Sequence, residues 1–276
     1  MQHLDGRVAV ITGASSGIGL GIARELARHG MKIVMASQSA DRLAAAAEEV
    51  RALGAEVLEV PTDVAKKAEI ERLAEKTLER FGAVHVLVNN AGVYAPGYAW
   101  ELGDDDWDWV VDVNYWGTVN GIRVFMPHLL EQDEAHVVNV SSAGGLMTAM
   151  CHGPYTSTKH AIVGLSKGLR VEVAMKESNV GVTLVCPGGV ATNISSQFDR
   201  SGPDGKPRGE RPVPPEVKEL WKAVDATVDG GISSDEVGRM VHQAITENVF
   251  WVLPNAECYF PIFDQEFEEM KNAIRN

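Results

Sequence analysis

The sequence predicts a single α/β domain with a doubly wound parallel sheet of about seven strands and helices on both faces. Three observations lead to this fold class. Short apolar runs alternate with longer helical patterns along the chain. Most of these runs are apolar throughout, as expected for parallel strands buried on both faces. Distinctive residues close several runs, namely Gly13, Asn89, Ser141 and Pro187, at the edge where open α/β sheets bind ligands.

Strand and helix patterns account for most of the chain. The expected strands are Arg7–Thr12, Lys32–Ala36, Glu56–Val60, Val84–Val88, Ala135–Val140, Gly181–Val185 and Phe250–Leu253. The expected helices are Gly17–His29, Ala40–Leu53, Lys66–Phe81, Asp104–Leu130, Tyr155–Met175 and Ser233–Glu247. In the first helix Ile18, Ile22 and Leu26 recur every four residues, which gives it one apolar face.

Composition narrows the class of protein. The chain has 276 residues, and 25 Lys and Arg against 38 Asp and Glu give a net charge of −13. Hydrophobic residues make up 45% of the chain, which excludes disorder for its bulk. The acidic balance argues against a nucleic-acid partner, because such a surface needs a basic stripe.

Cysteine usage and the N-terminus indicate a cytoplasmic protein. Cys151, Cys186 and Cys258 are too few and too widely spaced for a disulfide framework, and we expect no metal site. The first residues lack the basic and apolar segments of a signal peptide. No apolar run approaches the roughly 20 residues of a membrane span, so we expect no membrane partner.

Two segments depart from the alternating pattern within the expected domain 1–276. We expect a substrate loop at 193–231, in which Ser201–Pro215 is rich in Gly, Pro and charge and so predicts irregular structure. This loop is either a mobile lid over the substrate or a tolerated surface insertion. A C-terminal tail at 254–276 carries Phe267, Met270 and Ile274, which suggest a short amphipathic helix, docked on this chain or exchanged between subunits.

The turn from Thr12 to Gly19 has glycines in the spacing Gly-x-x-x-Gly-x-Gly between the first strand and the first helix. Glycines permit a tight turn and close backbone approach, and a helix N-terminus offers unpaired N–H groups to a diphosphate. The plain alternative is a glycine-rich turn without a ligand. The position after the first strand favours dinucleotide binding.

The end of the second strand bears on the choice between NAD and NADP. An acidic residue there would bind the ribose hydroxyls of NAD. This sequence has Ser37 and Gln38 instead, and Arg42 is within reach of a 2′-phosphate. NADP(H) is therefore favoured, and NAD(H) remains possible. Asp63, after the third strand, is expected to accept a hydrogen bond from adenine, to cap the next helix, or both.

Tyr155 and Lys159 lie one helical turn apart, so their side chains share a face. A lysine ammonium a few Å away stabilises a phenolate by roughly 3–4 kcal/mol at an effective dielectric near 20. We therefore expect a lowered pKa for Tyr155, which would act as general acid for a ketone or base for an alcohol. Ser142 is placed to hold the substrate oxygen. Asn114, unusual within a helix, is expected to bond a water or a backbone group near Lys159.

Six motifs together resemble the short-chain dehydrogenase/reductase family, in its compact branch of about 250 residues with a Rossmann fold. They are TGASSGIG at Thr12–Gly19, NNAG at Asn89–Gly92, Asn114, VNVSSAGG around Ser142, YTSTK at Tyr155–Lys159 and PGGVAT at Pro187–Thr192. The resemblance implies NAD(P) binding without metal, and a homodimer or homotetramer formed through the two long helices. It implies a catalytic tetrad of Asn114, Ser142, Tyr155 and Lys159.

The cofactor contacts expected from these motifs and from the strand ends lie along one edge of the sheet. They are Gly13, Ser15, Ser16, Gly17, Ile18, Gly19, Ser37, Gln38, Arg42, Asp63, Val64, Asn90, Ala91, Gly92, Tyr155, Lys159, Pro187, Gly188, Val190 and Thr192. The end of the second strand lacks both the family's NAD-selective Asp and its NADP-selective Arg, so the resemblance leaves the choice of cofactor open.

The residues that flank the tetrad are mostly large and apolar. Besides Ser142, those expected to line the substrate pocket are Tyr94, Tyr98, Trp100, Met147, Met150, Cys151, Ile194 and Phe198. They favour a bulky, hydrophobic, possibly aromatic secondary alcohol or ketone as the small-molecule substrate. Two short pieces, VATNISS and AITENVFWVLPNAE, are similar to bacterial Cα-dehydrogenases of aryl-ether alcohols. The alternative function is a non-catalytic dinucleotide-binding regulator or scaffold.

Overall fold

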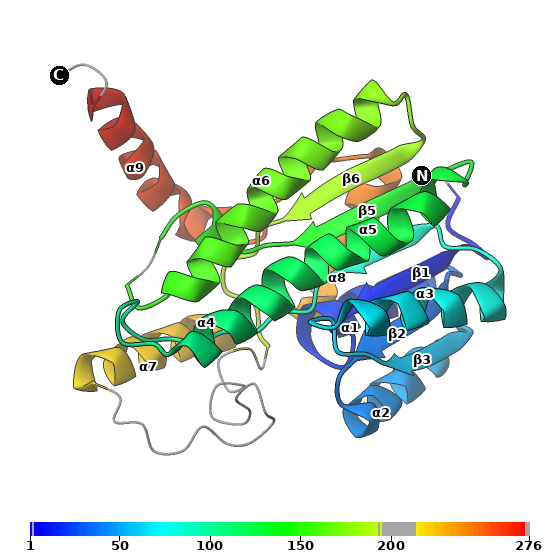
Figure 1. Cartoon of the computed structure of the whole chain (residues 1–276), viewed down its shortest axis with the longest axis horizontal. Coiled ribbons are helices and arrows are strands. Elements are labelled where there is room, and N and C mark those ends of the chain that lie inside the picture. Colours follow the sequence, from blue (N-terminus) through cyan, green and yellow to red (C-terminus); the bar gives the residue numbers. More distant parts are fainter. Residues whose placement is uncertain (2, 149, 193, 195–213, 274–276) are drawn as a thin grey trace.

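A computed structural model describes residues 1, 3–148, 150–192, 194 and 214–273. It confirms the doubly wound α/β fold, with a seven-stranded sheet in the order β3-β2-β1-β4-β5-β6-β7 (Figure 1). All neighbouring strands pair in parallel. The strands are β1 (Val8–Thr12), β2 (Lys32–Ser37), β3 (Val57–Pro61), β4 (Val86–Asn89), β5 (Ala135–Val140), β6 (Val180–Val185) and β7 (Trp251–Val252).

The helices follow the expected order, and their limits differ from the six ranges predicted above by at most two residues. The α-helices are α1 (Gly17–Arg28), α2 (Ala40–Arg51), α3 (Lys67–Phe81), α4 (Asp104–Val110), α5 (Gly117–Leu130), α6 (Gly153–Met175), α7 (Pro215–Asp229), α8 (Ser234–Glu247) and α9 (Phe260–Ala273). The shorter helical segments are η1 (Val111–Trp116), η2 (Ala143–Gly145) and η4 (Ala256–Cys258).

The sheet separates two hydrophobic cores. Successive side chains of a strand point to opposite faces. In β1, Ala9 and Ile11 therefore pack with α1, α2 and α8 on one face. Val8 and Val10 pack with α3, α5 and α6 on the other face. All four side chains are buried. This double burial explains why the strands read as continuous apolar runs. In Figure 1, α5 and α6 cross the near face of the sheet.

The chain reverses its direction of winding beside β1, which lies between β2 and β4. Loops that leave β1 and β4 therefore diverge to opposite faces and open a crevice at the carboxyl edge. The hydroxyl of Thr12 fastens the two loops, because its Oγ1 accepts hydrogen bonds from the backbone N–H groups of Asn90 at 3.0 Å and Ala91 at 3.1 Å. These hydrogen bonds hold the loops after β1 and β4 together at the base of the crevice.

Helices α1 and α8, from opposite ends of the chain, meet backbone to backbone. A Cβ added at Gly238 would lie 2.5 Å from the carbonyl oxygen of Gly21, and one added at Gly21 would lie 2.1 Å from the carbonyl oxygen of Ser234. Only glycine permits so close an approach. The N-terminal amine also donates to the carbonyl oxygen of Ile245, at 3.1 Å.

The long helix expected at Asp104–Leu130 forms as one helical run, but its middle turn, η1, is π-helical. Asn114 lies in this turn and is completely buried. Inserted turns of this type are frequent at functional sites. The sequence pattern predicts the length of the run and misses the change of helical type.

The loop expected at 193–231 contains a helix that the sequence analysis misses. Residues 214–229 include α7, which starts at Pro215, and proline is favoured in the first turn of a helix. Val217, Leu220 and Val228 recur at helical spacing, and the two valines are buried. Most of the segment Ser201–Pro215 lies outside the described residues.

The tail forms the expected amphipathic helix, α9, although Ile274 lies outside the described residues. None of the described residues of α9 is buried, and the helix projects away from the body of the molecule (Figure 1). Phe267 and Met270 are 47% and 57% exposed. The start of the tail is docked on this chain, because Tyr259 is buried and its hydroxyl donates to the carbonyl oxygen of Cys186. Helix α9 itself is not packed on this chain, and its exchange between subunits stays a prediction.

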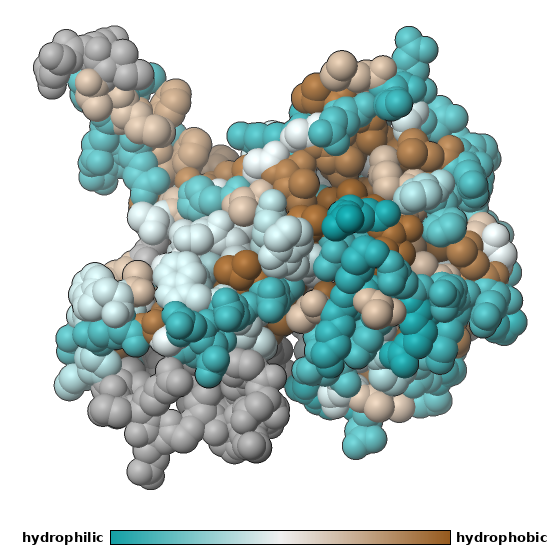
Figure 2. Space-filling model, viewed as in Figure 1, coloured by the Kyte–Doolittle hydropathy of each residue, from teal (hydrophilic) through white to brown (hydrophobic). Residues whose placement is uncertain are grey.

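Apolar surface gathers over α5 and α6 on the face shown in Figure 2. Leu130, Val171 and Met175 are 51%, 57% and 80% exposed there. Among the described residues, none of the helices is both long and apolar enough to cross a membrane.

Candidate active site

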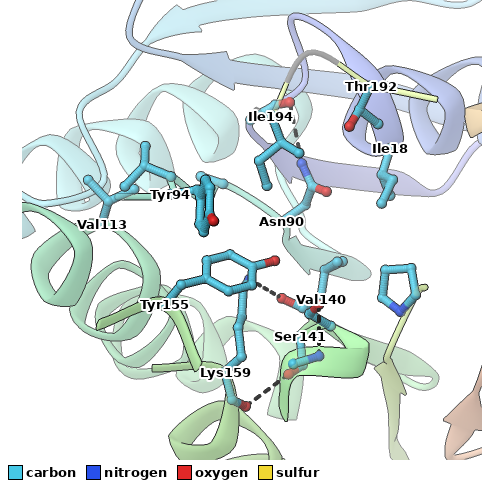
Figure 3. A pocket seen from close by; sticks show the side chains of 18 of the residues that line it. Ile18, Asn90, Tyr94, Val113, Val140, Ser141, Tyr155, Lys159, Thr192 and Ile194 are labelled. Carbon is cyan, nitrogen blue, oxygen red and sulfur yellow. Dashed lines mark hydrogen bonds between the residues drawn. The ribbon is translucent and has the colours of Figure 1, made fainter. Parts of the chain in front are cut away.

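A cavity of about 1070 Å³ opens at the carboxyl edge of the sheet, between the loops after the strands and α7. It brings together most of the residues expected to bind cofactor or substrate. The expected residues that line it are Gly13, Ser15, Ser16, Gly17, Ile18, Ser37, Gln38, Arg42, Asp63, Val64, Asn90, Ala91, Gly92, Tyr94, Ser142, Met147, Tyr155, Lys159, Pro187, Gly188, Val190, Thr192 and Ile194. Figure 3 shows part of this set around the cavity.

The glycine-rich turn is shaped for a close ligand. Gly13 has φ +65°, and a Cβ there would lie 2.8 Å from Nδ2 of Asn90. The hydroxyl of Ser16, the N-cap of α1, makes no capping hydrogen bond. The N–H groups in the first turn of α1 are thus left for an anion, as a dinucleotide diphosphate requires. The residues present therefore fit an NAD(P) cofactor.

The end of β2 forms the part of the cavity where the adenosine ribose would lie. The hydroxyls of Ser37 and Ser15 are 2.8 Å apart, and Arg42 lines the same cavity. Asp63 does not cap α3 directly: its Oδ1 accepts from the N–H of Ala65 at 3.1 Å in the preceding turn, and Lys66 pairs with its Oδ2 at 3.2 Å.

Ser142 presents a hydroxyl donor to the cavity. Its Oγ accepts a hydrogen bond from the N–H of Gly144 at 3.1 Å, so its own proton is available to a substrate oxygen. The neighbouring Ser141 has a different role, because its buried hydroxyl donates to the carbonyl oxygen of Lys159 at 2.8 Å. Ser142 thus faces the cavity, whereas Ser141 links the end of β5 to α6 by a hydrogen bond.

Tyr155 lies in the first turn of α6, and the Nζ of Lys159 lies 5.5 Å from the centroid of its ring. The Lys159 side chain is 3% exposed, and its ammonium donates to the carbonyl oxygen of Val140 at 3.1 Å (Figure 3). Burial lowers the pKa of Lys159 to about 8. Lys159 is therefore held in place at the floor of the cavity and is close to titration at neutral pH.

The pKa of Tyr155 differs from the sequence expectation, which was a lowered value. Burial raises this pKa, although the Ser142 hydroxyl acts in the opposite direction. Because Lys159 loses its proton near pH 8, its charge is gone before the free phenol would ionise. In the free protein Tyr155 is therefore poised as a proton donor, which suits an acid that protonates a ketone.

Asn114 lies behind the cavity wall and does not line it. Its Oδ1 accepts from the N–H of Val93 at 2.7 Å, and its Nδ2 donates to the carbonyl oxygen of Val93 at 3.0 Å and to Oγ1 of Thr158 at 3.1 Å. The oxygen and the nitrogen of the side-chain amide thus both have hydrogen-bond partners, in the loop after β4 and in α6. Asn114 joins the loop to the helix that carries Tyr155 and Lys159.

Several expected site residues do not reach the cavity. Gly19 packs beneath the turn, where a Cβ would lie 2.5 Å from Nδ2 of Asn90. Tyr98 donates from its hydroxyl to Glu216 on α7, at 3.0 Å, and stacks on Trp100. Cys151 is buried behind the cavity, with the unusual φ of +62°. Met150 is 60% exposed outside the cavity, and Phe198 lies outside the described residues.

The sequence analysis misses other residues that line the cavity. They include Asp105, Asp108, Trp109, Asp112, Val113, His152, Leu220, Val224, Val228 and Tyr259. For Leu220, Val224 and Val228, the apolar spacing of α7 was a usable signal. Tyr259 gives no local signal: its hydroxyl reaches the carbonyl oxygen of Cys186, at 2.8 Å, only because the tail returns to the sheet.

Comparisons with known proteins agree with this geometry. A family model for short chain dehydrogenases matches residues 7–201. A 1-deoxy-11-beta-hydroxypentalenate dehydrogenase from Streptomyces avermitilis is 32% identical over 277 residues, which cover 99% of this chain and 94% of that protein.

Solved structures show the same fold over nearly the whole chain. A short chain dehydrogenase/reductase from Burkholderia phymatum, in complex with NAD, is 37% identical with a TM-score of 0.93, and the match covers 99% of this chain and 97% of that one. An alcohol dehydrogenase from the archaeon Thermococcus sibiricus, complexed with 5-hydroxy-NADP, is 29% identical with a TM-score of 0.71, over 90% of this chain and 95% of that one. The chain therefore belongs to the short-chain dehydrogenase/reductase family and is an NAD(P)-dependent oxidoreductase.

Proposed function

We propose that this oxidoreductase interconverts a bulky, hydrophobic, uncharged secondary alcohol and its ketone, with Tyr155 as general acid–base. The observation that carries the proposal is the position of Tyr155, in one cavity with the donor hydroxyl of Ser142 and the buried ammonium of Lys159. The relative that is named a hydroxypentalenate dehydrogenase supports alcohol oxidation as the reaction type.

Each residue has a distinct task in this reaction. Ser142 donates a hydrogen bond to the substrate oxygen and holds it beside the phenol. Tyr155 gives its proton to that oxygen during ketone reduction, or takes the proton during alcohol oxidation. When bound, the nicotinamide ring supplies or accepts the hydride at the carbon. Lys159, anchored on Val140, provides the nearby cation and a donor for a ribose hydroxyl.

The lining of the substrate side supports a neutral, bulky ligand. Met147, Ile194, Leu220 and Val224 are apolar.

The test is a screen of aromatic and alicyclic secondary alcohols with each cofactor, followed by absorbance of the reduced nicotinamide. On any substrate found, Tyr155→Phe should reduce kcat to less than a few per cent and leave cofactor affinity within a few fold. Tyr115→Phe, at a tyrosine of η1 that does not line the cavity, is the matched control. Retention of substantial kcat by Tyr155→Phe would remove Tyr155 as the acid–base. Cofactor binding by the wild type without turnover of any alcohol or ketone would instead favour a regulator.

We further propose that NADP(H) is preferred over NAD(H). A serine stands at the end of β2, paired with Ser15, and Arg42 lines the same part of the cavity. The solved relatives include one bound to NAD and one bound to an NADP analogue, so both choices occur in the fold. A tenfold or greater preference of the wild type for NAD in kcat/KM would refute the proposal.

We also propose a homodimer or homotetramer, in line with the family resemblance. The exposed apolar residues Val171 and Met175 on α6 support an interface there, because single-chain surfaces rarely carry large apolar patches. Light scattering during size-exclusion chromatography should give a mass of two or four chains, and a monomeric mass would contradict the proposal.

A further inference from the structure

His152 and Tyr94 form a polar pair in the wall of the cavity that the proposed reaction leaves unused. The Nε2 of His152 lies 2.9 Å from the Tyr94 hydroxyl. The ring of Tyr94 meets the ring of Tyr155 edge-on, with centroids 5.4 Å apart and planes at 88°. Figure 3 shows these two tyrosines side by side in the cavity. The pair therefore lies next to the ring of the proposed acid–base.

The backbone fixes both partners. His152 is the N-cap residue of α6, and its carbonyl oxygen accepts from the N–H of Thr156 at 2.8 Å. An isolated bridge joins Gly97 to His152, and the N–H of Gly97 donates to the carbonyl oxygen of Cys151 at 3.0 Å. The loop that carries Tyr94 is thus attached to the helix that carries Tyr155, so the pair keeps its position relative to the acid–base.

The surroundings of His152 determine which group donates. Its Nδ1 lies 2.6 Å from the carbonyl oxygen of Met150, and a carbonyl only accepts, so Nδ1 carries the proton. Burial lowers the pKa of His152, so the ring is neutral at pH 7. The Nε2 of a neutral ring protonated at Nδ1 has a lone pair and accepts from the Tyr94 hydroxyl.

The consequence concerns what Tyr94 offers to a ligand. Its proton is directed to His152, so toward the cavity the phenol oxygen acts as an acceptor. A substrate that carries only ether or carbonyl oxygens in this region would find no matching donor in the pair.

We propose that Tyr94, oriented by His152, is a specificity-determining residue that selects substrates with a second hydrogen-bond donor, such as a hydroxyl, beside the reacting carbonyl. This inference rests on the proposed alcohol–ketone reaction and narrows its substrate class. His152 is a positioning residue, because it acts through the direction in which it fixes the proton of Tyr94.

The experiment uses aryl ketones in matched sets of three, which carry hydrogen, hydroxyl or methoxy at the same side-chain position. Methoxy keeps the acceptor oxygen of the hydroxyl and loses its donor. The readouts are kcat/KM and, independently of turnover, the Kd of each ketone from quenching of tryptophan fluorescence with cofactor present. Trp109 lines the cavity and supplies the signal. For the wild type we expect the hydroxyl ketone to be preferred over the methoxy ketone by about tenfold in at least one set, the worth of one hydrogen bond.

Variants then separate orientation from simple packing. Tyr94→Phe should bring the hydroxyl-to-methoxy ratio to within about twofold. His152→Phe removes the acceptor for the Tyr94 proton, so Tyr94 can donate and the ratio should shift toward the methoxy ketone. His152→Gln supplies an amide oxygen as acceptor and should restore the wild-type order. Tyr115→Phe should keep the wild-type ratio. Each ratio is measured within one protein, so general losses of activity cancel.

The outcomes distinguish this inference from the proposed function. Binding that discriminates as expected, without turnover of any ketone, would support the inference and overturn the proposed reaction. Turnover with equal Kd and kcat/KM across every set would overturn the inference alone. Failure of all ketones to bind would overturn it as well, and so would a His152→Phe ratio equal to that of His152→Gln.

Discussion

His136 makes the stability of this protein sensitive to mild acid. The histidine lies in β5, is 1% exposed, and has its Nε2 2.8 Å from Oγ1 of Thr183. Thr183 gives its own proton to the carbonyl oxygen of Val249, at 2.7 Å, so Nε2 of His136 must be the donor. The Nδ1 faces Gly181 so closely that a Cβ there would lie 2.3 Å away. A second proton on this ring would place a positive charge in the buried interior, which burial disfavours.

The magnitude follows from the difference in pKa between the folded and unfolded chains. Burial lowers the pKa of His136 from 6.5 to about 3. Between pH 6.5 and about pH 3, His136 binds a proton in the unfolded chain but not in the folded protein. The free energy of unfolding therefore falls as the pH falls. The loss is about 1.4 kcal/mol for each pH unit below 6.5, or about 2 kcal/mol at pH 5. Above pH 6.5 the contribution is constant.

Urea denaturation at pH 7 and pH 5 tests this reasoning. His136→Gln keeps an N–H donor for Thr183 and cannot titrate, so its free energy of unfolding should fall by about 2 kcal/mol less than that of the wild type over this range. The absolute stability of the variant does not enter the comparison. His160→Gln, at an exposed histidine of α6, should lose stability in parallel with the wild type. A parallel loss by His136→Gln would refute the argument.

Three further predictions concern the cofactor and the helix contact. Lys159 loses its charge above pH 8, because burial lowers its pKa to about 8. Cofactor affinity, measured by titration calorimetry, should therefore weaken as the pH rises through 8. Lys159→Met should abolish this pH dependence. Ser37→Asp should weaken NADP by tenfold or more in kcat/KM and leave or improve NAD, and an unchanged cofactor ratio would contradict the assigned role of this position. Gly238→Ala should lower the free energy of unfolding by about 1–3 kcal/mol, because its Cβ would lie 2.5 Å from a carbonyl oxygen. An unchanged free energy of unfolding in Gly238→Ala would disprove the close contact.

The sheet and the cofactor turn could be predicted from the sequence because their signals are local. Each strand is an apolar run buried on both faces, and Gly13 and Gly17 lie at positive φ where the turn needs them. The region around α7 could not be predicted with the same rules. Its start at Pro214 and Pro215 resembles the Gly- and Pro-rich stretch before it, so composition obscured the apolar spacing of the helix that follows.

The candidate site shows the same division between local and long-range signals. The spacing of Tyr155 and Lys159 follows from one helix, whereas their pKa values depend on burial by the rest of the fold. The pairing of Tyr94 with His152 joins residues 58 positions apart, and no local pattern indicates it. No local signal singles out His152, and its importance becomes visible once the loop after β4 is placed against α6.

The backbone contact between α1 and α8 has a consequence for how the protein is made. The turn that would hold the cofactor diphosphate lies at Thr12–Gly19, far ahead of α8 in the chain. Helix α1 nevertheless rests on Gly238 and Ser234, and the buried N-terminal amine rests on Ile245. A nascent chain therefore cannot complete its cofactor site until α8 has been synthesised. Nucleotide added during translation should protect chains that include α8 from proteolysis and leave shorter ones unprotected.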